Sequence, residues 1–162
     1  MPRKWPAGNR CGLTLLEMII ALAILSVLAA AVLPLAEMTV KRNKEIEMRR
    51  SLRLIRTAID DYKADYDKAV QQKKIMTSIN ETGYPKELED LVKGSDWGGL
   101  YPYAKKYLRR IPRDPFDVYD QGWGMRSYAD EPDTTVSGGE DVYDVFSQSD
   151  GTALDGTAYN TW

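Results

Sequence analysis

The stretch Gly12-Leu13-Thr14-Leu15-Leu16-Glu17 decides the fold, because an apolar run from Met18 to Ala36 follows it directly. Only Ser26 and Pro34 in that run depart from strongly apolar or small residues. Its 19 residues would span about 28 Å as a helix, close to the hydrocarbon thickness of a bilayer. The sequence therefore predicts a transmembrane helix with one carboxylate at its entrance.

The composition of the remaining chain is that of one small domain, since the whole sequence has 162 residues. The formal net charge is −2 and becomes −5 without the first 12 residues, so nucleic acid is not an expected partner. Cys11 is the only cysteine, which excludes an intrachain disulfide, and there is no histidine to act as a general base. The sequence contains no phosphate loop or nucleophile motif either, and we expect no enzyme.

Two ordinary interpretations of the N-terminus are a plain membrane anchor and a cleaved secretory signal. The secretory signal would be cut at the small residues Ala29-Ala30-Ala31. The apolar run is long for such a signal, and Glu17 at its edge is out of place there. A lipoprotein signal fits less well, because Cys11 precedes the apolar run instead of following it.

A third interpretation comes from a resemblance to known proteins. The order Gly12, Leu13, Thr14, two apolar residues, Glu17 and a long apolar run resembles the signal of type IV pilins and type II secretion pseudopilins. In that family a membrane peptidase cuts after the glycine on the cytoplasmic side and methylates the new N-terminus. The resemblance implies cleavage between Gly12 and Leu13, with Glu17 as the fifth mature residue. Leu13 stands where the family usually has Phe, and Pro34 matches a proline that many members carry.

Glu17 is expected to have a function in assembly, because an ionised carboxylate inside a bilayer costs at least about 2.5–3.5 kcal/mol. In the family its partner is the free amine of a neighbouring subunit's first residue, which here is Leu13. The alternative is that Glu17 lies at the headgroup boundary as an ordinary flank of an anchor. Lysine and arginine are equally frequent on both sides of the apolar run, so only the resemblance places the body of the protein outside the cytoplasm.

The anchor is expected to continue into an amphipathic helix, because residues 37–77 contain no glycine or proline. We predict a leader at 1–12, a transmembrane and assembly helix at 13–36, and an amphipathic helix at 37–79 that ends near Ile79-Asn80. Pro34 is expected to bend or locally open this helix. The helix carries one apolar stripe, which favours packing on the chain's own domain over a coiled coil with a partner. The stripe consists of Met48, Leu52, Ile55, Ile59, Tyr62, Tyr66 and Ala69.

Residues 80–162 are expected to form a small globular region with short strands. The two best strand candidates are rich in aromatic and β-branched residues and are separated by a polar loop. The sequence predicts an α+β fold, in which one long N-terminal helix packs on a small antiparallel sheet. The expected elements are a helix at 85–92, a loop at 94–99, a turn or edge at 111–116, strands at 123–129 and 142–146, and a loop at 130–139.

Three later segments resemble the major (G-type) pseudopilin of type II secretion systems. They are Thr82-Gly83-Tyr84-Pro85, the segment Arg110–Phe116, and Asp144–Gly151 with its continuation to Trp162. The resemblance implies a single-pass protein of the bacterial inner membrane with its C-terminal domain in the periplasm. It also implies self-assembly into a helical filament that drives protein export. The implied partners are prepilin peptidase, minor pseudopilins, the inner-membrane assembly platform and the lipid bilayer.

In that subfamily the terminal loop binds calcium through backbone carbonyls and aspartates. Asp150 corresponds to one of these aspartates, and Asp155 is the candidate to substitute for another through a shifted loop. The family's adjacent acidic pair falls at Thr157 and Ala158 here. The alternative is that Asp150-Gly151 and Asp155-Gly156 are simply turns.

Two other functions stay open at this point. One is a true type IV pilin for adhesion, motility or DNA uptake, although such subunits often close a C-terminal loop with a disulfide that this chain cannot form. The other is a membrane-tethered binding or enzymatic domain, for which the sequence offers no motif.

Overall fold

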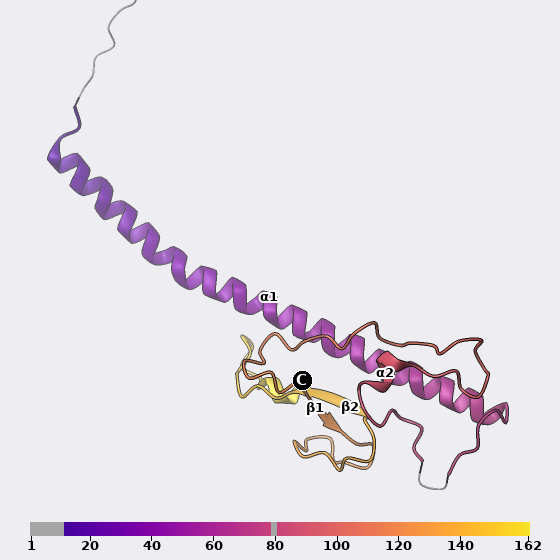
Figure 1. The fold of residues 1–162 in the computed structure, drawn as a ribbon. Coiled ribbons are helices and arrows are strands. Elements are labelled where there is room, and N and C mark those ends of the chain that lie inside the picture. The colour runs from indigo at the N-terminus through magenta and orange to yellow at the C-terminus, as the bar shows by residue number, and fades with distance from the viewer. Residues whose placement is uncertain (1–11, 79–80) are drawn as a thin grey trace, which may run out of the picture. The chain divides into compact units, whose positions relative to one another are not determined.

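The structure is a computed structural model that describes residues 12–78 and 81–162, so the predictions for the leader up to Cys11 lie outside it. Two compact units divide between Val40 and Lys41, within the first helix. The predicted α+β fold, a long N-terminal helix with a small antiparallel sheet, is confirmed (Figure 1). The elements are α1 (Leu15–Gln71), α2 (Asp90–Lys93), β1 (Trp123–Arg126), β2 (Asp144–Ser147) and the 3-10 helix η1 (Tyr159–Thr161).

Helix α1 ends earlier than the sequence predicts, at Gln71 instead of near Ile79. The amide of Lys73 donates to Val70 O (3.0 Å) and that of Lys74 donates to Ala69 O (2.9 Å). This pair of bonds is a Schellman cap, and Lys73 has the left-handed backbone (φ 55°) that the cap requires. The prediction was wrong because glycine normally takes this position, whereas the first glycine after the helix is Gly83.

Pro34 lies inside α1 without interrupting it. The predicted local opening is therefore not observed. Proline has no amide proton, so Pro34 cannot donate the one hydrogen bond expected at its position.

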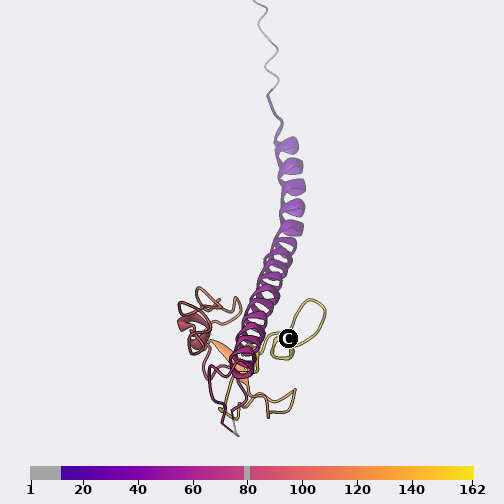
Figure 2. The same ribbon diagram turned by 90° about the vertical axis from the view of Figure 1, so that its right-hand side faces the viewer.

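The apolar stripe of α1 forms the core of the second unit, as predicted for packing on the chain's own domain. Met48, Ile55 and Ile59 are fully buried, and burying each such side chain contributes about 1.5–3 kcal/mol. In Figure 2 the segment around α2 and the C-terminal segment lie on opposite sides of this part of α1. The buried residues that join the stripe are Leu88, Leu91, Leu108, Trp123, Val142, Val145, Ala153 and Tyr159.

Asp65 fixes a second part of the domain to α1. Its side chain is only 1% exposed, and both of its oxygens accept hydrogen bonds. Burial alone raises the pKa of Asp65, but the hydrogen bonds outweigh burial and lower this pKa to about 2. Asp65 therefore remains a charged anchor for the chain after α2. Its donors are Lys105 Nζ, Tyr107 Oη (2.9 Å), Tyr101 Oη (2.9 Å) and Lys68 Nζ (3.3 Å).

The two strands pair antiparallel, with Trp123 opposite Ser147 and Gly124 opposite Phe146. A Cβ at Gly124 would lie 2.4 Å from the Phe146 ring, so this position needs glycine. Both predicted strands are confirmed with changed bounds. β1 ends at Arg126 because the next residues turn aside, and β2 begins at Asp144 because the amide of Val142 donates to Pro85 O (2.8 Å). Ser127 Oγ and the amide of Tyr128 donate to Asp141 Oδ1, at 2.8 and 2.9 Å.

The predicted helix at 85–92 is wrong in its extent, since α2 covers only Asp90–Lys93. Asp90 Oδ2 accepts the amides of Lys86 and Glu87, each at 3.2 Å, and so holds the preceding residues in a turn. Aspartate favours such local bonds over helix continuation. Leu88 and Leu91 still reach the core, as the apolar pattern indicated.

Candidate processing segment and C-terminal loop

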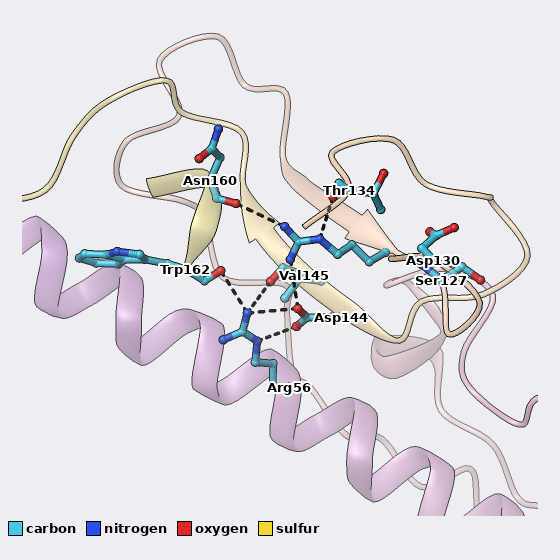
Figure 3. Close-up of polar contacts among 9 residues, drawn as sticks. Arg56, Ser127, Asp130, Thr134, Asp144, Val145, Asn160 and Trp162 are labelled. Atoms are coloured by element: carbon cyan, nitrogen blue, oxygen red, sulfur yellow. Dashed lines mark hydrogen bonds and ion pairs between the residues drawn. The ribbon is translucent and has the colours of Figure 1, made fainter. Parts of the chain in front are cut away.

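The C-terminal segment is tied to α1 through Arg56 (Figure 3). Arg56 Nε lies 2.6 Å from Asp144 Oδ1 on β2, and Nη2 lies 3.3 Å from Asp144 Oδ2. The same Nη2 donates to Val145 O (3.0 Å) and to Trp162 O (3.1 Å). A guanidinium has the planar donor geometry that such a bidentate contact requires. One side chain thus joins the helix, the strand and the C-terminal segment.

Arg126 on β1 contacts the same aspartate from the opposite side. Its Nη1 lies 3.3 Å from Asp144 Oδ2, and its Nε donates to Thr134 O (2.8 Å) in the loop between the strands. The guanidinium also lies over the Phe146 ring, 4.3 Å from its centroid, and Arg126 is only 7% exposed. The carboxylate of Asp144 therefore pairs with two guanidinium groups, and these ion pairs offset the cost of burying the charges.

Glu45 on α1 binds the loop that follows β2. Its Oε1 accepts the amide of Leu154 (2.8 Å) and the hydroxyl of Tyr159 (3.0 Å), and Glu45 is buried. Burial and then the hydrogen bond to Glu45 raise the pKa of Tyr159 to about 12, so the hydroxyl stays a donor at any physiological pH. Without Glu45, two donors of this loop would lose their partner inside the protein.

Arg49, one helical turn after Glu45, contacts the outer side of the same loop. Its Nη2 lies 3.1 Å from Asp155 Oδ2, and its guanidinium lies over the Trp162 ring at 4.0 Å from the centroid. Asp155 Oδ1 accepts the amide (3.0 Å) and the hydroxyl (2.6 Å) of Thr157. These bonds from Thr157, and then Arg49, hold the pKa of Asp155 below its usual value.

The two residues predicted to bind calcium are not brought together as a metal site. Both carboxylate oxygens of Asp155 already have donors, and Asp150 is exposed. Within residues 12–78 and 81–162, no three acidic, histidine or cysteine side chains are grouped so that they could hold a metal. Calcium needs six to eight oxygens including carboxylates, and the side chains of this loop alone do not supply them.

At the other end of the described chain, the predicted cleavage point lies just before α1. Gly12 and Leu13 have no regular secondary structure and are exposed. A Cβ built at Gly12 would have no neighbour within 4 Å. The peptide bond between Gly12 and Leu13 is therefore open to a protease.

Thr14 caps the start of α1, a function that our interpretation of the sequence missed. Its hydroxyl accepts the amide of Glu17 (3.2 Å), and its carbonyl accepts the amide of Met18 (3.1 Å). Thr-x-x-Glu ahead of an apolar run is the signature of a capping box, in which threonine is the N-cap and glutamate the third helical residue. That signature is present at Thr14-Leu15-Leu16-Glu17 and would have found the cap. The bond to Thr14 uses the backbone amide of Glu17, so the carboxylate keeps only the assembly role predicted for it.

The first part of α1 presents an apolar surface to its surroundings. Between Leu13 and Val40, sixteen large apolar side chains are each at least 50% exposed. The helix is long and apolar enough to cross a membrane. A soluble monomer rarely exposes so large an apolar surface, so lipid or other protein must cover this one.

Residues 8–33 match the family model described as the prokaryotic N-terminal methylation motif. The chain carries a prepilin-type signal. This signal implies processing by prepilin peptidase and assembly as a type IV pilin-like subunit, and it is common to pilins and secretion pseudopilins. No curated protein and no solved structure shows a significant match.

Three of the predicted site residues, Gly12, Leu13 and Glu17, lie within six positions in the prepilin-type signal. Pro34 lies further along, inside α1. Asp150 and Asp155 lie in the other compact unit. The residues that hold the C-terminal loop, Glu45 and Arg49, were not predicted. Glu45 had a signal in the sequence, because it lies one turn before Met48 on the buried side of α1.

Proposed function

We propose that this chain is the major structural subunit of a type II secretion pseudopilus. Prepilin peptidase cuts it after Gly12 and methylates Leu13. The segment 13–36 holds the subunit in the bacterial inner membrane, with the C-terminal domain in the periplasm. Minor pseudopilins and the inner-membrane assembly platform start and drive its polymerisation, and the growing filament moves proteins out of the cell.

The observation that carries this proposal is a prepilin-type signal directly in front of an exposed apolar helix. Before assembly, lipid covers the sixteen large apolar side chains between Leu13 and Val40. In a filament the same side chains pack against those of neighbouring copies. Because lipid and neighbouring helices are similarly apolar, exchanging one for the other changes the free energy little and does not fix the position of one subunit against the next. Glu17 sets that register.

The resemblance of residues 110–116 and 144–162 to a major pseudopilin is what favours secretion over a pilus, and these segments are in contact with each other and with β1. Trp123 Nε1 donates to Pro112 O (2.7 Å), which fixes the Ile-Pro-Arg-Asp-Pro-Phe segment to β1. Ser147 Oγ at the end of β2 donates to the buried Asp114 (2.5 Å). The Phe116 ring stacks on Tyr159 with centroids 4.2 Å apart. The two resembling segments therefore pack together in the folded domain, although they are far apart in sequence.

Intact-mass analysis of the full chain made together with prepilin peptidase tests the processing step. The expected product starts at Leu13 and carries one methyl group. A product that starts after Ala31 would identify a secretory signal instead. Glu17→Ala is then expected to be cut and methylated at the same position, with its mass changed only by the substitution, but to give no filaments, measured as the sheared, sedimentable fraction. Normal filament yield from Glu17→Ala would show that Glu17 does not set the register of neighbouring subunits.

A type IV pilin is the second candidate, because its prepilin-type signal is the same. The two functions separate in a strain that lacks this chain. The proposal expects exported enzymes to accumulate in the periplasm while surface adhesion, motility and DNA uptake stay normal. Unchanged export with loss of any of those three activities would make the chain a pilin.

A further inference from the structure

We propose that two side chains of α1, Glu45 and Arg49, close the C-terminal loop of this subunit in place of a metal ion, so that its assembly is independent of calcium. The assembly part of this inference rests on the proposed function. The closure part rests only on the contacts of the loop, residues 151–162, with α1.

The loop is hydrogen-bonded within itself before any ligand is considered. The amide of Ala153 donates to Thr157 O (2.7 Å), and the amide of Tyr159 donates to Gly151 O (3.1 Å). Trp162 Nε1 donates to Thr157 Oγ1 (2.8 Å). These three bonds use backbone and side-chain oxygens of the kind that would otherwise coordinate a calcium ion.

Glu45 supplies the carboxylate on the inner side of this loop. It is one of the few buried acids, at 8% exposure, and its Oε1 accepts from both Leu154 and Tyr159. A metal ion usually gathers loop carbonyls around a positive charge. Here a negative charge from the helix instead accepts hydrogen bonds from a backbone amide, which cannot bind a cation, and from a hydroxyl.

Arg49 supplies the positive charge on the outer side. It is within 3.1 Å of Asp155 Oδ2 and stacks on Trp162. A calcium ion at Asp155 would be repelled by this guanidinium and would compete with both bonds from Thr157. The positions of the family's acidic pair, Thr157 and Ala158, offer no carboxylate to compensate for that loss.

Thermal unfolding of the processed full chain in detergent, with millimolar calcium and with a chelator, tests the closure. The expected result is the same midpoint in both conditions. Glu45→Ala and Arg49→Ala are both expected to lower the midpoint, and the shift of each variant should be the same with and without calcium. Glu45→Ala should give the larger shift of the two. The matched controls Glu47→Ala and Arg50→Ala, whose side chains are exposed on the same helix, are expected to leave it unchanged.

A calcium-dependent rise of the wild-type midpoint that Asp150→Ala or Asp155→Ala cancels would overturn the inference. So would Glu45→Ala and Arg49→Ala variants as stable as their controls. Filament yield with and without chelator then tests the link to assembly, and loss of filaments in chelator would refute it. If the wild type forms no filaments in either condition, the proposed function fails, while the unfolding data still decide how the loop is closed.

Discussion

The apolar segment Leu13–Val40 and the C-terminal loop differ in where their side chains find partners. In the apolar segment, sixteen large apolar side chains are at least half exposed. In the loop, Tyr159 is 2% exposed and Ala153 is 5% exposed, and polar groups are paired with α1. The side chains of the first region need partners outside the monomer, whereas those of the second region find partners within it. Changes in the first should therefore alter processing and assembly, and changes in the second should alter stability.

Gly12→Val is expected to have the largest effect, because it acts on an all-or-none step. The β-branched side chain replaces the small residue at the predicted cleavage point, and the precursor should accumulate uncleaved. Western blotting of precursor and mature forms measures this. The midpoint of thermal unfolding should stay at the wild-type value, because Gly12 contacts nothing within 4 Å of its Cβ position. Efficient cleavage of Gly12→Val would show that Gly12 is not the residue after which the peptidase cuts.

Asp65→Asn is the corresponding change in the domain. It removes the charge that pairs with Lys105 and Lys68 in a side chain only 1% exposed. The expected loss is about 2–4 kcal/mol in the free energy of unfolding, with processing unchanged. Asp67→Asn is the control, since its pair with Lys63 is half exposed and is worth at most about 0.5 kcal/mol. Urea unfolding of both variants measures the difference.

The pH dependence of Asp65 gives this prediction a sign. Its pKa falls from 3.8 to about 2 on folding, so the folded state favours the charged form by about 2 kcal/mol. That contribution is complete above the unfolded pKa and is lost as the pH falls through the folded one. The gap between wild type and Asp65→Asn should therefore narrow between about pH 4 and pH 2. A constant gap over this range would mean that Asp65 acts by packing alone.

The same contrast explains what the sequence could predict. The prepilin-type signal is local, since Gly12 and Glu17 lie within six residues, and the stripe from Met48 to Ala69 repeats with the helical period. Both were found from the sequence; the match of residues 8–33 to the methylation-motif model confirms the signal, and the structure confirms the stripe. The helical period places Glu45 on the buried side of α1, but its contacts and those of Arg49 join residues more than a hundred positions apart, which no local pattern predicts. The helix end was missed because Lys73 takes a conformation for which glycine is the usual signal.

Thr14→Ala is expected to have the smallest effect, and it separates the helix cap from the charge of Glu17. The hydroxyl of Thr14 accepts the amide of Glu17 (3.2 Å), and losing an N-cap costs about 1 kcal/mol. Glu17→Gln keeps a residue that suits the capping box but removes the charge. If Glu17 acts through its charge, Glu17→Gln should abolish filaments, while Thr14→Ala lowers their yield by no more than about fivefold and Thr14→Ser leaves it unchanged. Normal filaments from Glu17→Gln with none from Thr14→Ala would make the cap, and not the carboxylate, the feature that assembly requires.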